Sequence, residues 1–146
     1  MSDHPDADCI FCKIIRAEIP CFKVWEDAET LAFMDINPVA RGHALIIPKL
    51  HTPNIFEAPE GKLGPVMNSV SRVARAVRDE VAPDGVNILQ ANGPGALQSV
   101  FHIHFHVIPR VHGDGLTMNW EIVPGDMAEI GALAEKIAAR TAADAG

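Results

Sequence analysis

Residues 101–108 read Phe-His-Ile-His-Phe-His-Val-Ile, a stretch in which histidine alternates with large apolar residues. Strict alternation of this kind predicts a β-strand, whose successive side chains point to opposite faces. His102, His104 and His106 would then share one face, and the apolar residues would share the other. Same-face neighbours lie roughly 7 Å apart along a strand, so one small substrate could contact two imidazoles. Groups that titrate near neutrality on a rigid backbone suit nucleophilic or acid–base chemistry.

Two other interpretations of this histidine face agree less well with the sequence. An ordinary solvated strand face usually carries Thr, Lys, Glu and Ser rather than one residue type three times. A catalytic metal held by all three histidines conflicts with their spacing, because side chains roughly 7 Å apart cannot all reach one ion at about 2 Å. We therefore expect the histidine face to be chemically functional.

Length and charge limit the kind of protein. The chain has 146 residues, enough for one domain with a core, and its 12 basic and 19 acidic residues give a net charge of −7. No basic cluster stands out, so we expect no nucleic-acid partner. The start is acidic without a hydrophobic signal region, and no run approaches the ~18 apolar residues of a membrane span. We expect a cytoplasmic protein with no membrane partner.

Short β-prone runs and one long amphipathic stripe predict an α+β fold. The β-prone runs lie at residues 22–25, 30–34, 43–48, 86–89 and 100–109. Consecutive strands without intervening helices favour an antiparallel sheet. Between Leu63 and Val81, apolar residues recur at helical spacing and predict one long helix. Asp126 followed by Glu129 is typical of the cap of a last helix, which we expect to end at about Arg140.

Several blocks of the sequence resemble, in order, those of one known family. The segment 98–110, Gln-Ser-Val-Phe-His-Ile-His-Phe-His-Val-Ile-Pro-Arg, resembles the signature of the histidine triad (HIT) family, His-φ-His-φ-His-φ-φ with φ apolar. Similar blocks begin at Cys9 (Cys-Ile-Phe-Cys-Lys-Ile-Ile), Glu18 (Glu-Ile-Pro), Leu31 (Leu-Ala-Phe-Met-Asp-Ile-Asn-Pro), Gly42 (Gly-His-Ala-Leu-Ile-Ile-Pro-Lys) and Gly85 (Gly-Val-Asn-Ile-Leu). The resemblance covers residues 9–111 and is closest to the bacterial-type, zinc-carrying branch.

The resemblance implies a fold, an activity and an assembly. The implied fold has a five-stranded antiparallel sheet, one long helix packed on it, and short N-terminal and C-terminal helices. The implied protein is a homodimeric hydrolase or transferase that cleaves at the α-phosphate of adenosine or other purine nucleotide derivatives, as phosphoramidases and dinucleoside polyphosphate hydrolases do. We expect a single HIT domain over residues 1–146, with a disordered lead at 1–8 and a C-terminal extension, carrying a helix, at 112–146.

By position, the resemblance makes His104 the nucleophile. Its imidazole would attack phosphorus, expel the leaving group and leave a covalent nucleotidyl-histidine that water then cleaves, which splits one difficult displacement into two easier ones. His106 is implied to serve the leaving group or the phosphate, and His43 to orient or polarise the nucleophile. A nucleotide-sensing or partner-binding module with little turnover is the alternative, although a binder has no need of a nucleophile.

The resemblance also implies the nucleotide contacts. A P-loop motif is absent from the sequence, so the phosphate donors are expected in the turn that begins at Asn92 and at Gln98 and Ser99, where backbone amides can form an anion-binding nest. Asp35 is implied to accept hydrogen bonds from the ribose hydroxyls, and Ile36 to pack against the base.

Each of these segments also has a purely structural interpretation. The glycines of the turn at residues 92–95 could simply make a tight connection, and Asp35–Pro38 has the composition of an ordinary turn. One residue departs from the family pattern, because Leu97 stands where relatives commonly have glycine. That departure would change how the loop meets the leaving group.

Cys9 and Cys12 form a Cys-x-x-Cys motif in a chain with three cysteines, which suits a reducing compartment. With His51 and His102, the two cysteines match the zinc ligands of the family, and a Cys₂His₂ set suits a closed, tetrahedral, structural zinc ion. A pair of buried thiols and a redox dithiol are the alternatives for the motif. Zinc on His102 would fix one end of the triad segment and help to position His104.

Overall fold

The computed structural model describes residues 7–117 and 121–145. Internal contacts divide the chain into two compact units, residues 1–114 and residues 115–146. The disordered lead expected at residues 1–8 lies outside the described residues, except for residues 7 and 8, which form a turn. A single domain with an extension from residue 112 stays a prediction. Within the described residues, no helix is long and apolar enough to cross a membrane.

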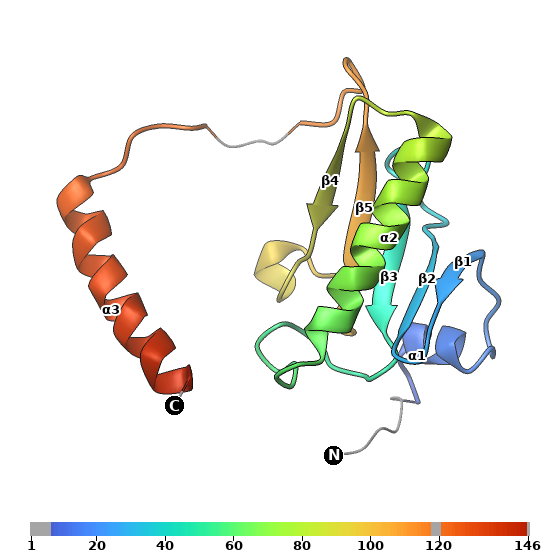
Figure 1. Cartoon of the computed structure of the whole chain (residues 1–146), viewed down its shortest axis with the longest axis horizontal. Coiled ribbons are helices and arrows are strands. Elements are labelled where there is room, and N and C mark those ends of the chain that lie inside the picture. The colour runs from blue at the N-terminus through green and yellow to red at the C-terminus, as the bar shows by residue number, and fades with distance from the viewer. Residues whose placement is uncertain (1–6, 118–120, 146) are drawn as a thin grey trace. The chain divides into compact units, whose positions relative to one another are not determined.

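A five-stranded antiparallel sheet forms the larger unit, as the short apolar runs predict (Figure 1). Its strands are β1 (Lys23–Glu26), β2 (Thr30–Met34), β3 (Ala44–Pro48), β4 (Gly85–Leu89) and β5 (Phe105–Arg110). Their spatial order is β1-β2-β3-β5-β4, and every neighbouring pair is antiparallel. The histidine segment therefore leads into a strand inside the sheet, where neighbours on both sides hold the backbone.

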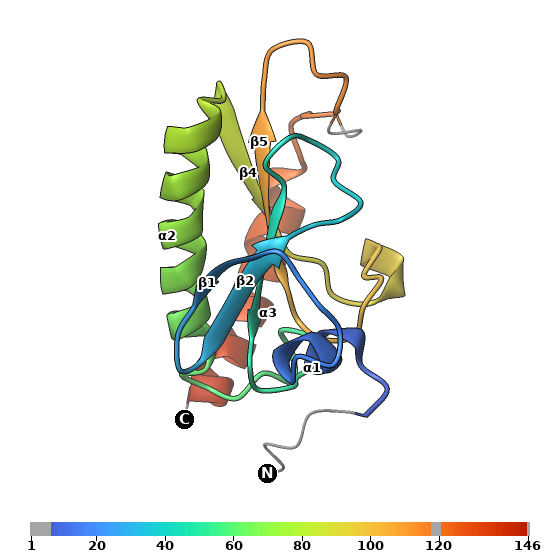
Figure 2. The same ribbon diagram turned by 90° about the vertical axis from the view of Figure 1, so that its right-hand side faces the viewer.

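The long helix α2 (Leu63–Val81) covers one face of the sheet and has the predicted bounds (Figure 2). Its buried side chains pack against side chains of the strands and form a core with them. The main contributors to this core are Val66, Val70, Val73, Ile46, Ile103, Phe105 and Val107. At roughly 1.5–3 kcal/mol for each fully buried large apolar side chain, this core holds the apolar side of the histidine segment in place.

Helix α1 (Ile10–Ile15) lies on the opposite side of the sheet from α2, as Figure 2 also shows. A second, smaller core lies between it and the strands. Phe11 enters this core with Leu31, Phe33, Leu45 and Ile47. The first turn of α1 is closed by the thiol of Cys9, which accepts a hydrogen bond from the amide of Cys12 at 3.4 Å. The Cys-x-x-Cys motif is thus wound into a helical turn on the histidine side of the sheet.

The histidine strand is shorter than predicted. β5 begins at Phe105, so His102 and His104 precede the strand. The backbone leaves the sheet ladder here, because the amide of Ile103 donates to the carbonyl of Thr52 at 2.7 Å instead. The alternation of side chains nevertheless continues through the irregular residues, since every second residue is buried in the core under α2. Those residues are Ile103, Phe105 and Val107.

Helix α3 (Met127–Ala145) belongs to the smaller unit. The carboxylate of Asp126 accepts hydrogen bonds from the amides of Ala128 and Glu129, which is the cap that the sequence predicts. The helix runs beyond the predicted end near Arg140. Residues 138–145 are rich in alanine, the strongest helix former, and contain neither glycine nor proline to stop the helix.

Candidate active site

His104 is held as a neutral imidazole with one free lone pair. Its Nδ1 lies 2.8 Å from the carbonyl oxygen of His102. Since a carbonyl only accepts, Nδ1 carries the proton, and Nε2 keeps its lone pair. His104 is 5% exposed, and burial lowers its pKa below the usual 6.5. At neutral pH the residue therefore presents an unprotonated nitrogen, which is the form a nucleophile needs.

His43 and His106, the histidine beside His104, form a hydrogen-bonded pair in which the donor can be assigned. The amide of Val39 donates to Nδ1 of His43 at 3.1 Å, so the proton of neutral His43 lies on Nε2. That Nε2 is 2.9 Å from Nδ1 of His106. His43 thus donates to His106, and the proton of His106 is left on its Nε2. Burial lowers the pKa of His43 and lowers that of His106 to about 4, so both are neutral near pH 7.

The structure shows which histidine His43 contacts, while its expected role toward the nucleophile stays a prediction. Its hydrogen bond goes to His106 rather than to the nucleophile. The rings of His104 and His106 lie 5.0 Å apart between centroids. His43 therefore sets which nitrogen of His106 carries a proton, and through it which donor His106 presents beside His104.

Asp35, His43 and His106 have ligand atoms within 4.8 Å of one another, a spacing that a metal ion could use. A metal on Nε2 of His43 would require the proton to sit on Nδ1. The amide of Val39 already donates to Nδ1, so two N–H groups would face each other. We infer that this trio is a hydrogen-bonded group and not a metal site.

A cavity of about 340 Å³ opens beside the triad. Its lining combines apolar side chains, Phe11, Ile14, Phe33 and Ile36 among them, with the polar residues Asp35, Asn37, Ser99, His104 and His106. The volume and the mixture of an apolar wall with a few polar groups are typical of a small-ligand site. Phe11 packs edge-on against Phe33 at 5.6 Å and against His104 at 5.1 Å between ring centroids, which ties the apolar wall to the nucleophile.

Asp35 is one of the polar residues that line this cavity. One carboxylate oxygen accepts from the amide of Asn37 at 2.8 Å, as in an Asx turn, and the other lies 3.5 Å from Nε2 of His43. The carboxylate is therefore oriented toward the cavity before any ligand binds. Asp35 and Ile36 both line the cavity, as the sequence predicts for ribose and base contacts.

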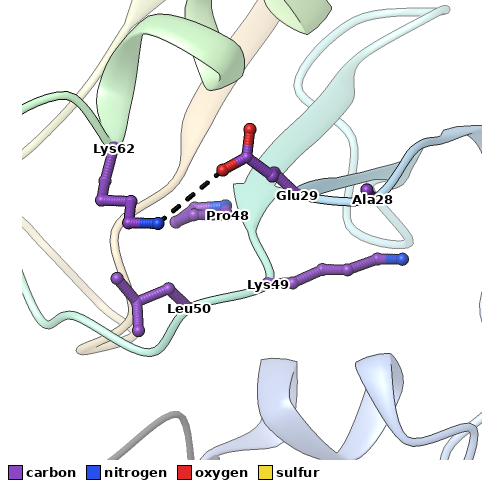
Figure 3. Close-up of a pocket in the computed structure, with 6 residues that line it drawn as sticks. All are labelled: Ala28, Glu29, Pro48, Lys49, Leu50 and Lys62. Atoms are coloured by element: carbon purple, nitrogen blue, oxygen red, sulfur yellow. Dashed lines mark ion pairs between the residues drawn. The ribbon is translucent and has the colours of Figure 1, made fainter. Parts of the chain in front are cut away.

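A second cavity, of about 240 Å³, lies at the end of β3 and differs in character (Figure 3). Its two lysines each face a carboxylate: Lys62 Nζ is 3.8 Å from Glu29, and Lys49 Nζ is 3.0 Å from Glu26. None of the histidines lines it. Its positive charge is already balanced, so we place the candidate active site in the triad cavity.

The predicted phosphate residues divide into two groups. Ser99 lines the triad cavity. The side chains of Asn92 and Gln98 are instead bonded to the protein itself. Asn92 Oδ1 accepts from the amide of Ile55 at 2.8 Å and from Gln90 at 2.7 Å, and both Nε2 hydrogens of Gln98 are donated to backbone carbonyls. These bonds support the loop, and a contact of either residue with phosphate stays a prediction.

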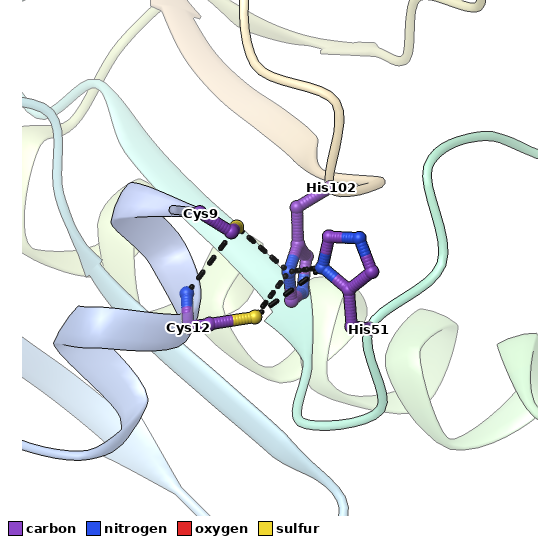
Figure 4. Close-up of side chains that lie close together, drawn as sticks. All are labelled: Cys9, Cys12, His51 and His102. Carbon is purple, nitrogen blue, oxygen red and sulfur yellow. Dashed lines mark hydrogen bonds between the residues drawn. The ribbon is translucent and has the colours of Figure 1, made fainter. Parts of the chain in front are cut away.

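Cys9, Cys12, His51 and His102 come together in a single cluster (Figure 4). The sulfur of Cys12 lies 3.3 Å from Nδ1 of His51, each cysteine sulfur lies 3.5 Å from Nδ1 of His102, and the two nitrogens lie 3.2 Å apart. A tetrahedral zinc ion with bonds of about 2.0–2.3 Å separates its ligands by about 3.3–3.8 Å. The donor set and its spacing therefore fit zinc.

The second nitrogen of His102 supports the same interpretation. Its Nε2 lies 2.8 Å from the carbonyl oxygen of Pro48 and so donates a hydrogen bond. The lone pair of His102 is then on Nδ1, which faces the two cysteines. Metal-binding histidines are commonly oriented by such a bond to the opposite ring nitrogen. Cys21 lies outside this cluster and packs against the second core.

The sequence gives no indication of the backbone groups that define these roles. The amide of Val39 and the carbonyls of Pro48 and His102 set the tautomers of three histidines. Backbone groups are present at every position, so nothing in the residue types marks them. Gln90, which pairs with Asn92 through two amide hydrogen bonds, was also missed. Its place between β4 and the turn at residues 92–95 is the one available signal.

Comparison with known proteins agrees with this geometry. The HIT domain family matches residues 16–113. The adenosine 5′-monophosphoramidase of Schizosaccharomyces pombe is 41% identical over 133 residues, which cover 90% of this chain and 97% of that protein. The crystal structure of a HIT family member from Bacillus subtilis is 43% identical with a TM-score of 0.86, and the match covers 91% of this chain and 96% of that one.

A third similar protein is a zinc-bound histidine triad family protein from Mycobacterium smegmatis. Its crystal structure has a TM-score of 0.72 and 36% identity, over 94% of this chain and 97% of that one. The region that the HIT domain family matches, residues 16–113, contains the triad and all five strands of the sheet. The chain belongs to the HIT family.

Proposed function

We propose that this protein is a nucleotide hydrolase or transferase that cleaves the bond between the α-phosphate of a purine nucleotide derivative and its leaving group. The observation that carries the proposal is the unprotonated Nε2 of His104 in the wall of the triad cavity. A purely nucleotide-sensing module is the alternative function, and it gives no reason for a buried, neutral imidazole at this point.

The reaction would run in two displacements. Nε2 of His104 attacks the α-phosphorus, and the bond to the leaving group breaks with its electron pair going to the leaving group. The Nε2–H of His106 donates a hydrogen bond to the leaving atom or to a phosphate oxygen, and so stabilises the charge that develops there. Water then attacks the phosphorus of the nucleotidyl-histidine, and the P–Nε2 bond breaks with its electron pair returning to His104. The nucleotide is released with a hydroxyl oxygen from water, and the proton that water loses balances the proton that the leaving group has taken up.

The remaining cavity residues would hold the nucleoside. Asp35 accepts from the ribose hydroxyls, because its carboxylate is oriented toward the cavity by the amide of Asn37. Ile36 and the aromatic wall contact the base. Ser99 and backbone amides of the loop at residues 92–99 serve the phosphate. The similarity to an adenosine 5′-monophosphoramidase favours an amine as the leaving group over a second nucleotide, sulfate or a sugar phosphate.

We also propose that Cys9, Cys12, His51 and His102 hold a structural zinc ion. When bound, zinc would be coordinated by all four residues, which leaves no open coordination position for substrate. The donor set, its spacing and the hydrogen bond from His102 to Pro48 support this, together with the zinc-bound relative. The four ligands come from α1, from the segment after β3 and from the segment before β5, so the ion would link three separate parts of the site.

Further proposals concern assembly and location. We propose a homodimer, because among the described residues β4 lies at an edge of the sheet and pairs with β5 alone, and a second copy could extend the sheet across a two-fold axis. A cytoplasmic location is proposed from cysteine usage, because an odd number of cysteines, two of them in a Cys-x-x-Cys motif, suits a reducing compartment.

The activity is tested with a panel of adenosine 5′-derivatives that differ only in the leaving group. We expect the highest kcat/KM for a phosphoramidate with an amine leaving group, and loss of nearly all kcat in His104→Ala. Since the nucleoside contacts do not involve this residue, affinity for the nucleotide should be largely kept. Wild-type turnover in His104→Ala, or nucleotide binding with no turnover of any panel member by the wild-type protein, would contradict the proposal.

A further inference from the structure

The loop that carries Ser99 is tied to the segment at residues 51–55 by side-chain amides. Gln98 Nε2 donates to the carbonyls of Pro53 at 2.5 Å and Val100 at 3.0 Å, while its Oε1 accepts from the amide of Gly93 at 2.7 Å. Both N–H groups of the Gln98 side-chain amide therefore donate to carbonyl groups within the protein. Gln98 is also only 5% exposed, so its side chain is a buried link between two loops.

The backbone beside Gln98 has a conformation that needs such support. Leu97 has φ 65° and ψ 29°, in the left-handed region, although it is not glycine. This conformation is unfavourable for a residue with a side chain, and it persists only where the surroundings fix it. The bonds of the Gln98 side chain, together with its backbone amide to the carbonyl of Gly93 at 3.1 Å, provide that constraint.

Ser99 follows directly and lines the cavity with His104 and His106. The part of the cavity expected to hold the nucleoside is built mostly from other elements, since Phe11 lies in α1, Phe33 lies in β2 and Asp35 follows β2, whereas Val100 alone joins this apolar wall from the segment after Ser99. A change in the loop at residues 93–99 would therefore move the leaving-group part of the site and leave most of the nucleoside part in place.

We propose that Gln98 is a positioning residue for the leaving-group step. Its amide holds the loop against the segment at residues 51–55 and so fixes the Ser99 hydroxyl and the neighbouring backbone amides relative to Nε2 of His104. The inference rests on the proposed function, because it assigns a role within that reaction. It replaces a direct contact between Gln98 and phosphate with an indirect one.

The test is Gln98→Met, which keeps the volume of the side chain and removes all three of its hydrogen bonds. Two substrates are compared: adenosine 5′-phosphoramidate with a basic alkylamine leaving group, and the 4-nitrophenyl ester of AMP, whose leaving group needs little stabilisation. We expect kcat to fall on the order of tenfold or more for the alkylamine substrate, since small misplacements of reacting groups are costly. The 4-nitrophenyl ester should lose much less, and KM should change less than about threefold for either.

Asn87→Ala is the matched control for a general loss of stability. Asn87 in β4 accepts a hydrogen bond from Arg110, away from the cavity. This variant should lower the melting temperature and leave the ratio of the two kcat values unchanged. In Gln98→Met, faster hydrogen exchange at the amide of Gly93 should accompany the kinetic change.

The outcomes separate the inference from the function on which it rests. An unchanged ratio in Gln98→Met, with an active wild-type protein, would overturn the positioning role alone. An equal loss on both substrates would do the same, because it would reflect a general loss of folded protein. Failure of the wild-type protein to turn over either substrate would instead overturn the proposed function.

Discussion

Three histidines around the cavity differ in the hydrogen bonds that each receives or donates. His104 donates to a carbonyl and keeps a free nitrogen, whereas His106 receives a hydrogen bond from His43 and keeps a free N–H. The same side chain therefore supplies a nucleophile at one position and a hydrogen-bond donor at the other. The difference comes entirely from which groups lie behind each ring.

The pH dependence follows from the lowered pKa values of His43 and His106. Burial lowers both, to about 4 for His106. Between pH 6.5 and about 4 the unfolded chain binds protons at these residues that the folded chain does not. The contribution of these two neutral histidines to the free energy of unfolding is therefore fully present above pH 6.5 and is lost as the pH falls through this window.

The acid limb of the pH–activity profile should be shifted to lower pH in the same way. We expect kcat/KM, measured with a leaving group that does not ionise in the range, to keep its neutral-pH value down to below pH 6.5 and to fall at lower pH. His43→Ala removes the hydrogen bond that fixes the tautomer of His106, so it should change the shape of the profile. An acid limb of the wild-type profile centred at or above pH 6.5 would show that the critical imidazoles titrate as ordinary exposed histidines.

Much of this residue-scale picture could be predicted, and part of it could not. The alternation of residues 101–108 and its resemblance to the HIT signature identified His104 and His106, because residue type and spacing are visible in the sequence. The partner of His43 and the buried bonds of Gln98 were not visible, because they depend on backbone groups that folding brings together.

Among the elements, α2 was predicted to the residue, whereas the start of β5 was placed too early. A nineteen-residue amphipathic stripe contains several turns of periodic signal. Alternation predicts which way side chains point but does not say whether the backbone pairs with a neighbour. At Ile103 the amide bonds Thr52 rather than a strand, and the strand ladder starts two residues later.

The junction between His43 and the preceding turn depends on Gly42. Its φ is 94°, and an added Cβ would lie 2.9 Å from Cγ2 of Val81 and 3.1 Å from Cγ of Pro109. We expect Gly42→Ala to lower the free energy of unfolding by about 2 kcal/mol or more, from the left-handed conformation and the close contact with α2.

Gly64→Ala is the control for this substitution. Gly64 lies in α2 with ordinary dihedral angles, and nothing lies within 4 Å of an added Cβ. Alanine there should be neutral or slightly stabilising. The free energies of unfolding of the two variants are measured with denaturant. Equal values would show that the close contact between an added Cβ at Gly42 and Val81 is relieved at no cost.

The Cys/His cluster joins α1 to the segments before β5 and after β3. If these residues bind zinc only in the folded state, a free zinc concentration of 100 times the dissociation constant stabilises the fold by about 2.7 kcal/mol. We expect a strong chelator to lower the melting temperature, and Cys12→Ser to lower it in the same way and to abolish the effect of the chelator.

Cys21→Ser provides the matched control, because Cys21 lies outside the cluster. This variant should respond to the chelator as the wild-type protein does. Elemental analysis of gently purified protein should give one zinc per chain. Protein without metal, or a melting temperature that ignores both the chelator and Cys12→Ser, would refute the zinc assignment.

At the scale of the whole molecule, the free edge of β4 is the feature that argues for assembly. In the part of the chain that the structure describes, β4 pairs on one side only, with β5, and its residues Ile88 and Leu89 are exposed. Exposed sheet edges are usually covered or paired. We expect light scattering at micromolar concentration to give about twice the chain mass of 15.7 kDa, and a charge placed on the edge, as in Ile88→Lys, to shift the protein toward the monomer. A mass of a single chain for the wild-type protein would exclude the dimer.

The most direct test of the account is to isolate the covalent intermediate on His104. The reaction with an adenosine 5′-phosphoramidate is quenched within one turnover, and the digested protein is analysed by mass spectrometry. We expect an acid-labile adenylyl group on His104, absent from His104→Ala, and retention of configuration at phosphorus over the complete reaction because two inversions cancel. Net inversion, together with turnover that leaves no adduct on His104, would contradict the account and indicate direct attack by water.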